Sequence, residues 1–305
     1  MKKPDKELIK EITDLKKKRN AVIIAHYYQR PEVQDAADLL GDSLALSRAA
    51  AETNAEVIVF CGVNFMAETA SILSPDKKVI IPVRDAGCPL ADTIDVKGLR
   101  EMKKKHPAAL VVCYVNTAAE IKAESDICCT SSNSIKVVNS LPPDKEIIFV
   151  PDKNLCDYTS SVTGRRLICW QGDCATHANI KADEIKEALK LHPSAKVMVH
   201  PECTAEVIGM ADCVGSTAGM LRYAGESSAG EFIVGTEVGI IHQLKIENPF
   251  KVFYPTLEPA LCPTMKLITL EKVLWSLENL SHEVKVAEDI RIKAKRSIDG
   301  MLAIG

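Results

Sequence analysis

The sequence lacks the features that mark several common classes of protein. No apolar run approaches the roughly 18 residues of a membrane-spanning helix, and the N-terminal MKKPDKELIKEITDLKKK has no apolar core like that of a signal peptide. The 38 Lys and Arg are scattered among 41 Asp and Glu, so no basic face for nucleic acid or an anionic membrane stands out. No Gly-rich dinucleotide loop is present, which predicts no bound NAD. We therefore expect a cytoplasmic protein that acts on small molecules.

The chain has eleven cysteines, yet no two of them have the C-x-x-C spacing. This absence removes the main support for a zinc ribbon or a thioredoxin-like redox site, and disulfides are disfavoured in the cytosol. Five cysteines in or beside apolar strand-like runs are expected to be buried small hydrophobic residues: Cys61, Cys113, Cys128, Cys129 and Cys169. Three have no predicted role: Cys156, Cys203 and Cys213.

The other three cysteines divide the chain almost evenly. Cys88 and Cys174 are 86 residues apart, and Cys174 and Cys262 are 88 apart. Each lies in a loop shortly after an apolar run (VIIPVRDAGC, RLICWQGDC, VFYPTLEPALC). Since eleven cysteines offer many triples, the spacing needs independent support, and an internal repeat supplies it.

Helical and strand-like segments alternate in the same order three times, in a βαβαβαβ-like pattern. The apolar runs that end in polar residues are typical of parallel strands buried on both faces. The first pass has helices at 5–19, 32–40, 44–53 and 64–73 and strands at 21–29, 56–63 and 78–83. The second has helices at 97–106, at 117–124, from about 132, and before 165, with strands at 109–116, 146–154 and 165–170. The third has helices at 183–191, 204–210 and 238–245 and strands at 196–202, 231–237 and 251–255.

The register of the repeat is consistent at four positions. His26, Tyr114 and His200 end the first strand of each pass. An Asp follows each by 12 residues, and a hydroxyl residue follows that Asp by five: Asp38 and Ser43, Asp126 and Ser131, Asp212 and Thr217. Each cysteine then closes its pass. This agreement is typical of a genuine repeat.

The predicted fold class is therefore α/β, with three repeats related by a pseudo-threefold axis around a central cavity. Each repeat is a small parallel sheet flanked by helices. We predict repeats at 1–88, 89–174 and 175–262. The tail 263–305, with helices at 269–280 and 287–302 and a short strand near 283–286, is expected to pack back on the first repeat.

Polar side chains follow the first strand of each repeat, where ligands bind in open parallel sheets. They are acid–base and hydrogen-bonding groups: His26-Tyr27-Tyr28, Tyr114-Val115-Asn116 and His200-Pro201-Glu202. A hydroxyl set lies at the strand-to-helix junctions: Asp42-Ser43, Thr130-Ser131 and Ser216-Thr217. Such residues cap helices, and the same junctions attract anions. The pattern predicts a substrate with several carboxylates or a phosphate.

Three cysteines without a fourth equivalent match a [4Fe–4S] cluster in which one iron stays open to substrate as a Lewis acid. The alternative is zinc held by three sulfurs and a histidine, with Cys203 beside His200 as a further candidate ligand.

Together these residues resemble the quinolinate synthase (quinolinate synthetase A) family over nearly the whole chain. The matching stretches are AHYYQRPEVQDAADLLGDSL (25–44), GVNFMAETA (62–70), CPLAD (88–92), YVNTAAE (114–120), CTSSN (129–133), PDKNL (151–155), VHPEC (199–203), VGSTAGM (214–220), GTEVGIIHQL (235–244) and CPTMK (262–266). The resemblance implies three similar α/β domains around a central [4Fe–4S] cluster. It also implies condensation of iminoaspartate with dihydroxyacetone phosphate to quinolinate, which releases phosphate and two waters and supplies the pyridine ring of NAD.

The resemblance carries roles onto matching positions. The cluster ligands would be Cys88, Cys174 and Cys262, and Tyr28, Glu202, His26 and His200 would be catalytic. The substrate-binding residues would be His26, Ser43, Tyr114, Asn116, Ser131, His200, Glu202, Ser216 and Thr217. We expect Tyr28 and Glu202 to do most of the proton transfer and His26 and His200 to orient carboxylates. A functional link to an aspartate oxidase or dehydrogenase that makes iminoaspartate follows from the substrate.

This sequence departs from some family members in having no C-x-x-C just before the third cysteine, where it reads Leu-Cys-Pro-Thr-Met, so no redox switch is expected there. Two other functions stay open at this point. One is a different iron–sulfur hydro-lyase acting on a polycarboxylate. The other is a non-catalytic metal sensor with a structural zinc site.

Overall fold

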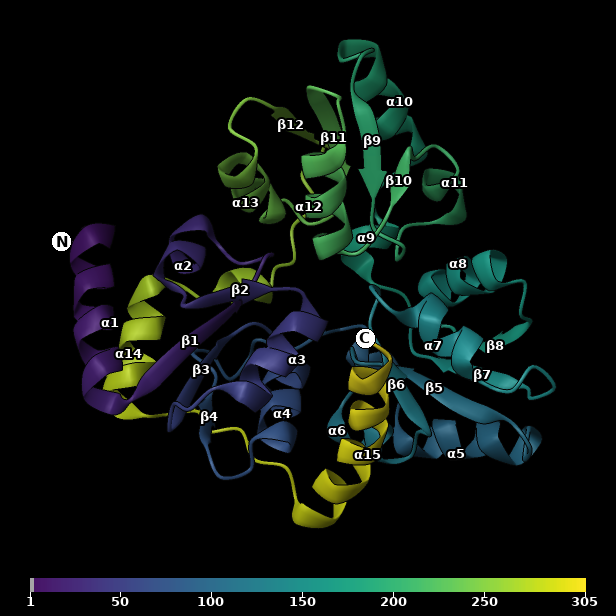
Figure 1. Cartoon of the computed structure of the whole chain (residues 1–305), viewed down its shortest axis with the longest axis horizontal. Helices are drawn as coiled ribbons and strands as arrows, with labels where there is room; N and C mark the ends of the chain where they lie inside the picture. Colours follow the sequence, from purple (N-terminus) through teal and green to yellow (C-terminus); the bar gives the residue numbers. More distant parts are fainter. Residues whose placement is uncertain (1–2) are drawn as a thin grey trace.

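The computed structural model describes residues 3–305 and contains three parallel sheets, each of four strands (Figure 1). The strand orders are β2-β1-β3-β4, β6-β5-β7-β8 and β10-β9-β11-β12. The same permuted order recurs in each sheet, with the first strand of each unit placed second. Helices flank the sheets, and the three units surround a common centre. The predicted α/β class with three repeats is confirmed.

The elements follow the predicted alternation. The first unit has α1 (Asp5–Arg19), β1 (Ala21–His26), α2 (Pro31–Ala36), β2 (Leu39–Gly41), α3 (Ser43–Glu52), β3 (Val57–Cys61), α4 (Asn64–Leu73) and β4 (Lys78–Ile80). The second has a 3₁₀ turn (Ala91–Thr93), α5 (Val96–Lys105), β5 (Leu110–Tyr114), α6 (Ala119–Ala123), β6 (Ile127–Cys129), α7 (Ser134–Ser140), β7 (Ile147–Val150), α8 (Lys153–Thr163) and β8 (Leu167–Cys169).

The third unit has α9 (Ala175–Ala178), α10 (Ala182–Leu191), β9 (Lys196–Val199), α11 (Ala205–Ile208), β10 (Cys213–Val214), α12 (Thr217–Glu226), β11 (Glu231–Gly235), α13 (Ile240–Glu247) and β12 (Val252–Pro255). The tail has a 3₁₀ turn (Met265–Leu267), α14 (Leu270–Asn279) and α15 (Glu288–Ile304). Of the helices in the described part of the chain, none has the length and apolar character needed to span a bilayer.

The aspartate that repeats in the sequence has the same structural role in all three units. Asp38 Oδ2 accepts a hydrogen bond from Ile23 N at 2.8 Å, and its backbone N–H donates to Ile23 O at 2.9 Å. The same two bonds join Asp126 to Val111, at 2.7 and 3.1 Å, and Asp212 to Val197, at 2.8 Å for both. The aspartate thus ties the second strand to the first. The sequence offset is the trace of this bond.

The central strands are built from the longest apolar runs. All five residues of β3 (VIVFC) and all four of β7 (IIFV) are buried, as expected for strands covered by helices on both faces. Cys61, Cys113, Cys128 and Cys129 are buried, as predicted. Cys169 is a correction: it lies on the edge strand β8, is only half-buried, and forms a disulfide with Cys156 of α8.

Two segments differ from the prediction. The helix expected at 32–40 ends at Ala36, and 39–41 forms the edge strand β2. The equivalent β6 and β10, like β2, have only two or three residues and no length-based signal. The strand expected near 283–286 is reduced to one antiparallel bridge between Ile80 and Glu283.

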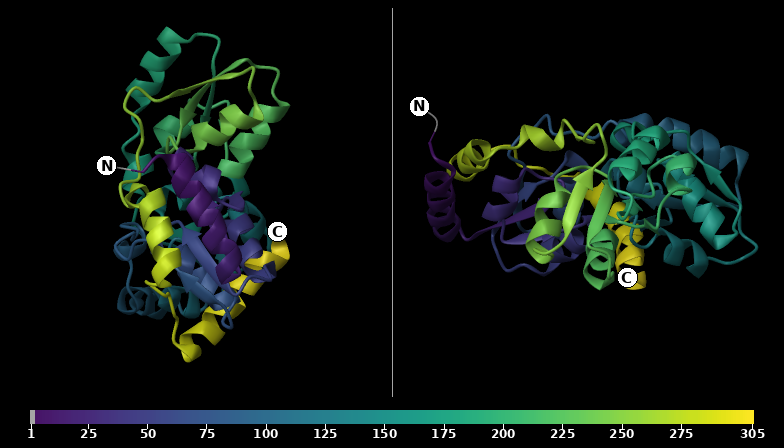
Figure 2. Two further views of the ribbon diagram at one scale, coloured as in Figure 1. Left: turned by 90° about the vertical axis from the view of Figure 1, so that its left-hand side faces the viewer. Right: turned by 90° about the horizontal axis from the view of Figure 1, so that it is seen from above.

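The tail contacts two units. α14 packs beside α1, which both views in Figure 2 show from other sides. α15 packs on α6 and β6 and also contacts α4, so it lies between the first and second units (Figure 1). We predicted the whole tail on the first repeat, and α15 departs from this because its apolar face covers the second unit as well. The predicted boundaries 1–88, 89–174 and 175–262 stay a prediction.

Candidate active site

The carboxyl ends of the first strands of the three sheets meet at one buried cavity, which we call the inner cavity. Its free volume is about 70 Å³. Twelve of the thirteen residues predicted from the sequence line it: His26, Tyr28, Ser43, Cys88, Tyr114, Asn116, Ser131, Cys174, His200, Glu202, Thr217 and Cys262. The three units therefore bring together side chains that lie up to 236 residues apart, from His26 to Cys262.

Ser216 is the exception. Its Oγ accepts a hydrogen bond from Gly219 N at 3.2 Å and so caps α12. It lines a second, outer cavity and is absent from the inner lining, while its neighbour Thr217 faces inward. The helix start fixes which of the two hydroxyls faces which cavity, and the sequence alone did not separate them.

The three cysteines line the inner cavity from one loop in each unit. Burial raises the pKa of Cys88 to about 12, and burial also raises the pKa of Cys174. A thiolate in this setting needs a nearby cation, and a metal is the usual one at a cysteine cluster. Cys203, the further candidate, is buried elsewhere: its Sγ lies 3.5 Å from Gly235 O, and it is absent from the lining.

Two buried carboxylates hold two of these cysteine loops. Asp152 Oδ2 accepts a hydrogen bond from Cys174 N at 3.1 Å, and Glu237 Oε1 accepts one from Cys262 N at 3.2 Å. Each acid lies two residues beyond the end of the third strand of its unit, β7 or β11. The position equivalent in the first unit is Val63, so Cys88 has no such anchor.

Glu237 also forms a buried ion pair. Lys266 Nζ lies 2.9 Å from Glu237 Oε1 and donates to Tyr28 O at 2.5 Å. One carboxylate thus connects the Cys262 loop to the strand end of the first unit. Burial raises the pKa of Glu237, and Lys266 opposes that rise.

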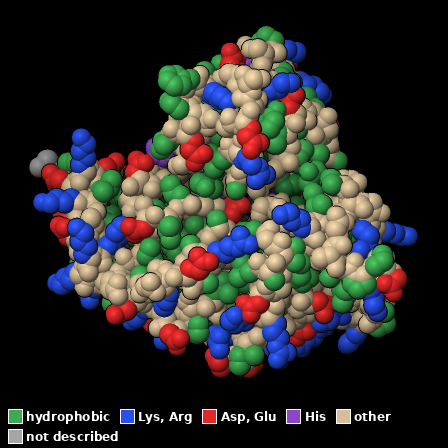
Figure 3. All heavy atoms as spheres, in the orientation of Figure 1, with side chains coloured by type: hydrophobic (Ala, Val, Ile, Leu, Met, Phe, Trp, Pro, Cys, Tyr) green, Lys and Arg blue, Asp and Glu red, His purple; other side chains and the backbone are tan. Residues whose placement is uncertain are grey.

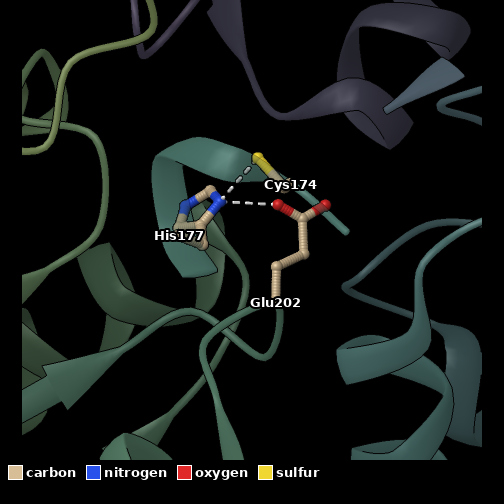
Figure 4. Close-up of side chains that lie close together, drawn as sticks. All are labelled: Cys174, His177 and Glu202. Carbon is tan, nitrogen blue, oxygen red and sulfur yellow. Dashed lines mark hydrogen bonds and ion pairs between the residues drawn. The ribbon is translucent and has the colours of Figure 1, made fainter. Parts of the chain in front are cut away.

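His177 was not predicted, and it lies at the centre of the site. Figure 4 shows its ring between the Cys174 sulfur and the Glu202 carboxylate. Nδ1 lies 2.6 Å from Glu202 Oε2 and 3.2 Å from Cys174 Sγ, while Nε2 lies 2.8 Å from Thr236 Oγ1. These three groups, Cys174, His177 and Glu202, are close enough together to hold a metal ion. The spacing Cys-x-x-His in 174–177 was the available signal.

The Glu202 carboxylate has one occupied and one free oxygen. Burial alone would raise the pKa of Glu202, but His200 and His177 beside it lower that pKa to about 2. Oε1 is buried and has no hydrogen-bond partner among the described residues, and the same holds for Asn116 Oδ1. Because unpaired buried acceptors are costly, these atoms indicate where a ligand donates hydrogen bonds.

His26 and His200 are neutral near neutral pH. Burial lowers the pKa of each to about 3. His26 Nδ1 accepts a hydrogen bond from Tyr28 N at 3.1 Å, and His200 Nδ1 accepts one from Glu202 N at 3.3 Å. With Nδ1 an acceptor, the proton of the neutral ring is on Nε2, and for His200 it points to Ser131 Oγ at 3.1 Å. Both rings therefore present an N–H donor.

Tyr28 completes the polar wall. Its hydroxyl lies 2.5 Å from Thr236 Oγ1 and 3.4 Å from His177 Nε2. Burial raises the pKa of Tyr28 well above its usual value, so the phenol stays protonated and can donate. Burial and the charge of Glu202 do the same to the pKa of Tyr114.

The sequence is similar to one family throughout. The model of the family described as quinolinate synthetase A protein matches residues 10–303. Quinolinate synthase 1 of Methanosarcina acetivorans is 55% identical over 298 residues, which cover 98% of each chain. Quinolinate synthase of Thermodesulfovibrio yellowstonii is 54% identical over 297 residues, 97% of this chain and 98% of that one. Quinolinate synthase of Geobacter metallireducens is 52% identical over 294 residues, 96% of each. The chain is therefore an enzyme that belongs to the quinolinate synthetase A family.

Proposed function

We propose that this enzyme condenses iminoaspartate with dihydroxyacetone phosphate to quinolinate, releasing phosphate and two waters, in de novo NAD biosynthesis. The observation that carries the proposal is the convergence of three cysteines, neutral hydrogen-bond donors and one ionised carboxylate in one cavity of a family member. The curated relatives are named quinolinate synthase. Both proposed substrates are anionic and need several donors to hold them.

The proposed cofactor is one [4Fe–4S] cluster per chain, held by Cys88, Cys174 and Cys262. The donor set fits: one thiol from each unit lines the same cavity, and the fourth side is lined by Glu202, His200 and Tyr28 instead of a fourth cysteine. When bound, such a cluster supplies an open iron that acts as a Lewis acid toward substrate oxygen. Asp152 and Glu237 support the fit because they fix the backbone of two ligand loops.

Neutral donors would hold the substrate carboxylates and phosphate. Among the described residues that line the inner cavity there is no Lys or Arg. We therefore assign anion binding to the hydroxyls of Ser43, Ser131 and Thr217 and to the N–H donors of His26 and His200. Asn116 and Tyr114 hold the remaining polar edge.

Proton transfer would involve Glu202, His177 and Tyr28. Condensation requires removal of a proton next to a carbonyl, and the later dehydrations require an acid at the leaving hydroxyls. A carboxylate with a pKa of about 2 is a weak base alone. We therefore assign the base to the Glu202–His177 pair, whose atoms are 2.6 Å apart and share protons as one unit. Tyr28, kept protonated by burial, is the proposed acid.

A mononuclear metal site is the second candidate, because Cys174, His177 and Glu202 lie close enough to bind one ion. Anaerobic purification with metal analysis separates the two. About four irons per chain with broad absorbance near ~400 nm support the cluster. One zinc and no colour would refute it and favour a metal sensor.

A polycarboxylate hydro-lyase with the same cluster is distinguished by products. The proposed enzyme forms quinolinate only when both iminoaspartate and dihydroxyacetone phosphate are supplied, whereas a hydro-lyase dehydrates one substrate without the other. The functional link to an iminoaspartate-producing oxidase or dehydrogenase, and the cytoplasmic location, remain predictions.

A further inference from the structure

An outer cavity adjoins the inner cavity where the three units meet. Its volume is about 570 Å³, and it shares Asp42 and Ser131 with the inner lining. It is lined by the first turns of α3, α7 and α12, one from each unit, and by Gly305 at the end of α15. In Figure 1 this end of α15 lies at the centre of the molecule, so the outer cavity lies over the site.

Three cations line the outer cavity at equivalent positions of the repeat. Arg48, Lys136 and Arg222 each follow the inner hydroxyl residue of their unit by five residues. Since α3, α7 and α12 begin in the same register, five residues bring each cation a little more than one turn beyond its hydroxyl. We call these three residues the cation ring. All three are exposed, and Figure 3 shows Lys and Arg side chains near the meeting point of the units.

The ring is mostly free to meet a ligand. No ion pair within residues 3–305 involves Lys136 or Arg222. Arg48 Nη2 donates to Leu302 O at 3.3 Å, which orients it, and its charge opposes the rise in the pKa of Asp42 that burial causes. Asp42 and Glu226 are the acidic side chains in the lining, and Asp42 is occupied in capping α3 at Ala45 N, 2.9 Å away. Three cations therefore face one free carboxylate.

The division of charge between the two cavities is the key observation. The described lining of the inner cavity has no Lys or Arg, while the outer cavity has one basic residue from every unit. An anionic substrate thus meets cations only before it reaches the neutral donors inside. A ring of like charge around a concave surface focuses its potential and raises the local concentration of the opposite ion.

We propose that the cation ring is an entry site for the phosphate group of the substrate, which it captures and passes to the inner cavity. This rests on the proposed function for the identity of the substrate. The ligand class is a phosphate monoester dianion. The exposed ring contributes to the association rate more than to the chemical step, because surface charges act mainly by steering.

The kinetic test compares two triple variants with equal charge change. R48Q/K136Q/R222Q removes the ring, and K10Q/K105Q/K245Q removes three exposed lysines that line none of the described cavities. At an ionic strength of about 0.01 M we expect kcat/KM for dihydroxyacetone phosphate to fall about tenfold in the ring variant, and kcat to fall less. At about 0.5 M the difference should shrink to about twofold because salt screens exposed charges. Equal losses in the two triples would overturn the proposal.

A binding test separates the ring from the reaction. Titration calorimetry with inorganic phosphate uses the full chain and needs no turnover. The wild type and the control triple should bind phosphate, and the ring triple should bind at least about fivefold more weakly. Equal phosphate affinity in the wild type and the ring triple overturns the ring even if quinolinate is formed. Loss of phosphate affinity in a chain that makes no quinolinate supports the ring while refuting the proposed function.

Discussion

His177 Nδ1 lies 2.6 Å from Glu202 Oε2, in a cavity where each of the two side chains is about 3% exposed. The pair joins the helical turn after Cys174 to the strand end of the third unit. His177 therefore connects the predicted ligand Cys174, 3.2 Å away, to the carboxylate with a free oxygen. This contact couples the proposed metal site to the proposed base.

Replacing Glu202 by Gln should lower kcat by about 100-fold or more, because the pair loses its negative charge and general-base groups contribute factors of this size. The iron content and the visible absorbance should stay at the wild-type level. Steady-state quinolinate formation with iron analysis checks both. The matched control is Glu206→Gln, an exposed acid on α11 nearby in sequence. Full activity in Glu202→Gln would rule out its role.

Replacing any one of Cys88, Cys174 and Cys262 by Ser should remove the brown colour, since each is the only thiol that its unit contributes to the inner cavity. Anaerobic absorption spectra near about 400 nm measure this. Cys203→Ser is the control and should keep the colour, because Cys203 does not line the cavity. Loss of colour in Cys203→Ser with its retention in Cys174→Ser would show that the ligand assignment is wrong.

Replacing Glu237 by Gln should destabilise the protein by about 2 kcal/mol. The change leaves Lys266 without its buried counter-charge and weakens the bond to Cys262 N. Urea unfolding gives the free energy, and Glu258→Gln, an exposed acid in the same unit, should change it by less than about 0.5 kcal/mol. A Glu237→Gln protein as stable as the wild type would contradict the anchor.

Acid should destabilise the fold through His26 and His200. Burial lowers the pKa of each to about 3, below its unfolded value of about 6.5. The unfolded chain therefore takes up these protons first, so the stability is complete above pH 6.5 and falls as the pH decreases toward 3. At pH 5 the loss is about 2 kcal/mol for each histidine.

Urea unfolding at pH 7 and pH 5 measures this loss. His26→Gln should reduce the difference between the two pH values by about 2 kcal/mol, whereas His106→Gln, a histidine outside the cavity, should not. The same slope in His26→Gln and the wild type would mean that His26 titrates normally in the folded chain.

The sequence predicts this fold well where long apolar runs and repeated offsets carry the signal. The helices at 5–19 and 64–73 have the predicted bounds, and the offset of 12 residues reports a hydrogen bond between Asp38 and Ile23. The edge strands β2, β6 and β10 escaped prediction because two or three residues form a strand only beside an existing neighbour.

The part of the site that depends on tertiary contacts was harder to predict. His177 owes its position to Glu202, which is 25 residues away in the sequence, and to Thr236, which is 59 away. Cys169 was expected to be buried, but its strand β8 is at the edge of the sheet, where α8 brings Cys156 to it. In both cases the partner is set by packing between elements, which local sequence patterns do not encode.

The measurement that tests the central claim most directly is quinolinate formation by the anaerobically purified chain, followed by mass spectrometry, with each substrate omitted in turn. The account predicts quinolinate only when iminoaspartate and dihydroxyacetone phosphate are both present, and none from Cys174→Ser. A preparation that holds about four irons per chain and forms no quinolinate from the two substrates would contradict it.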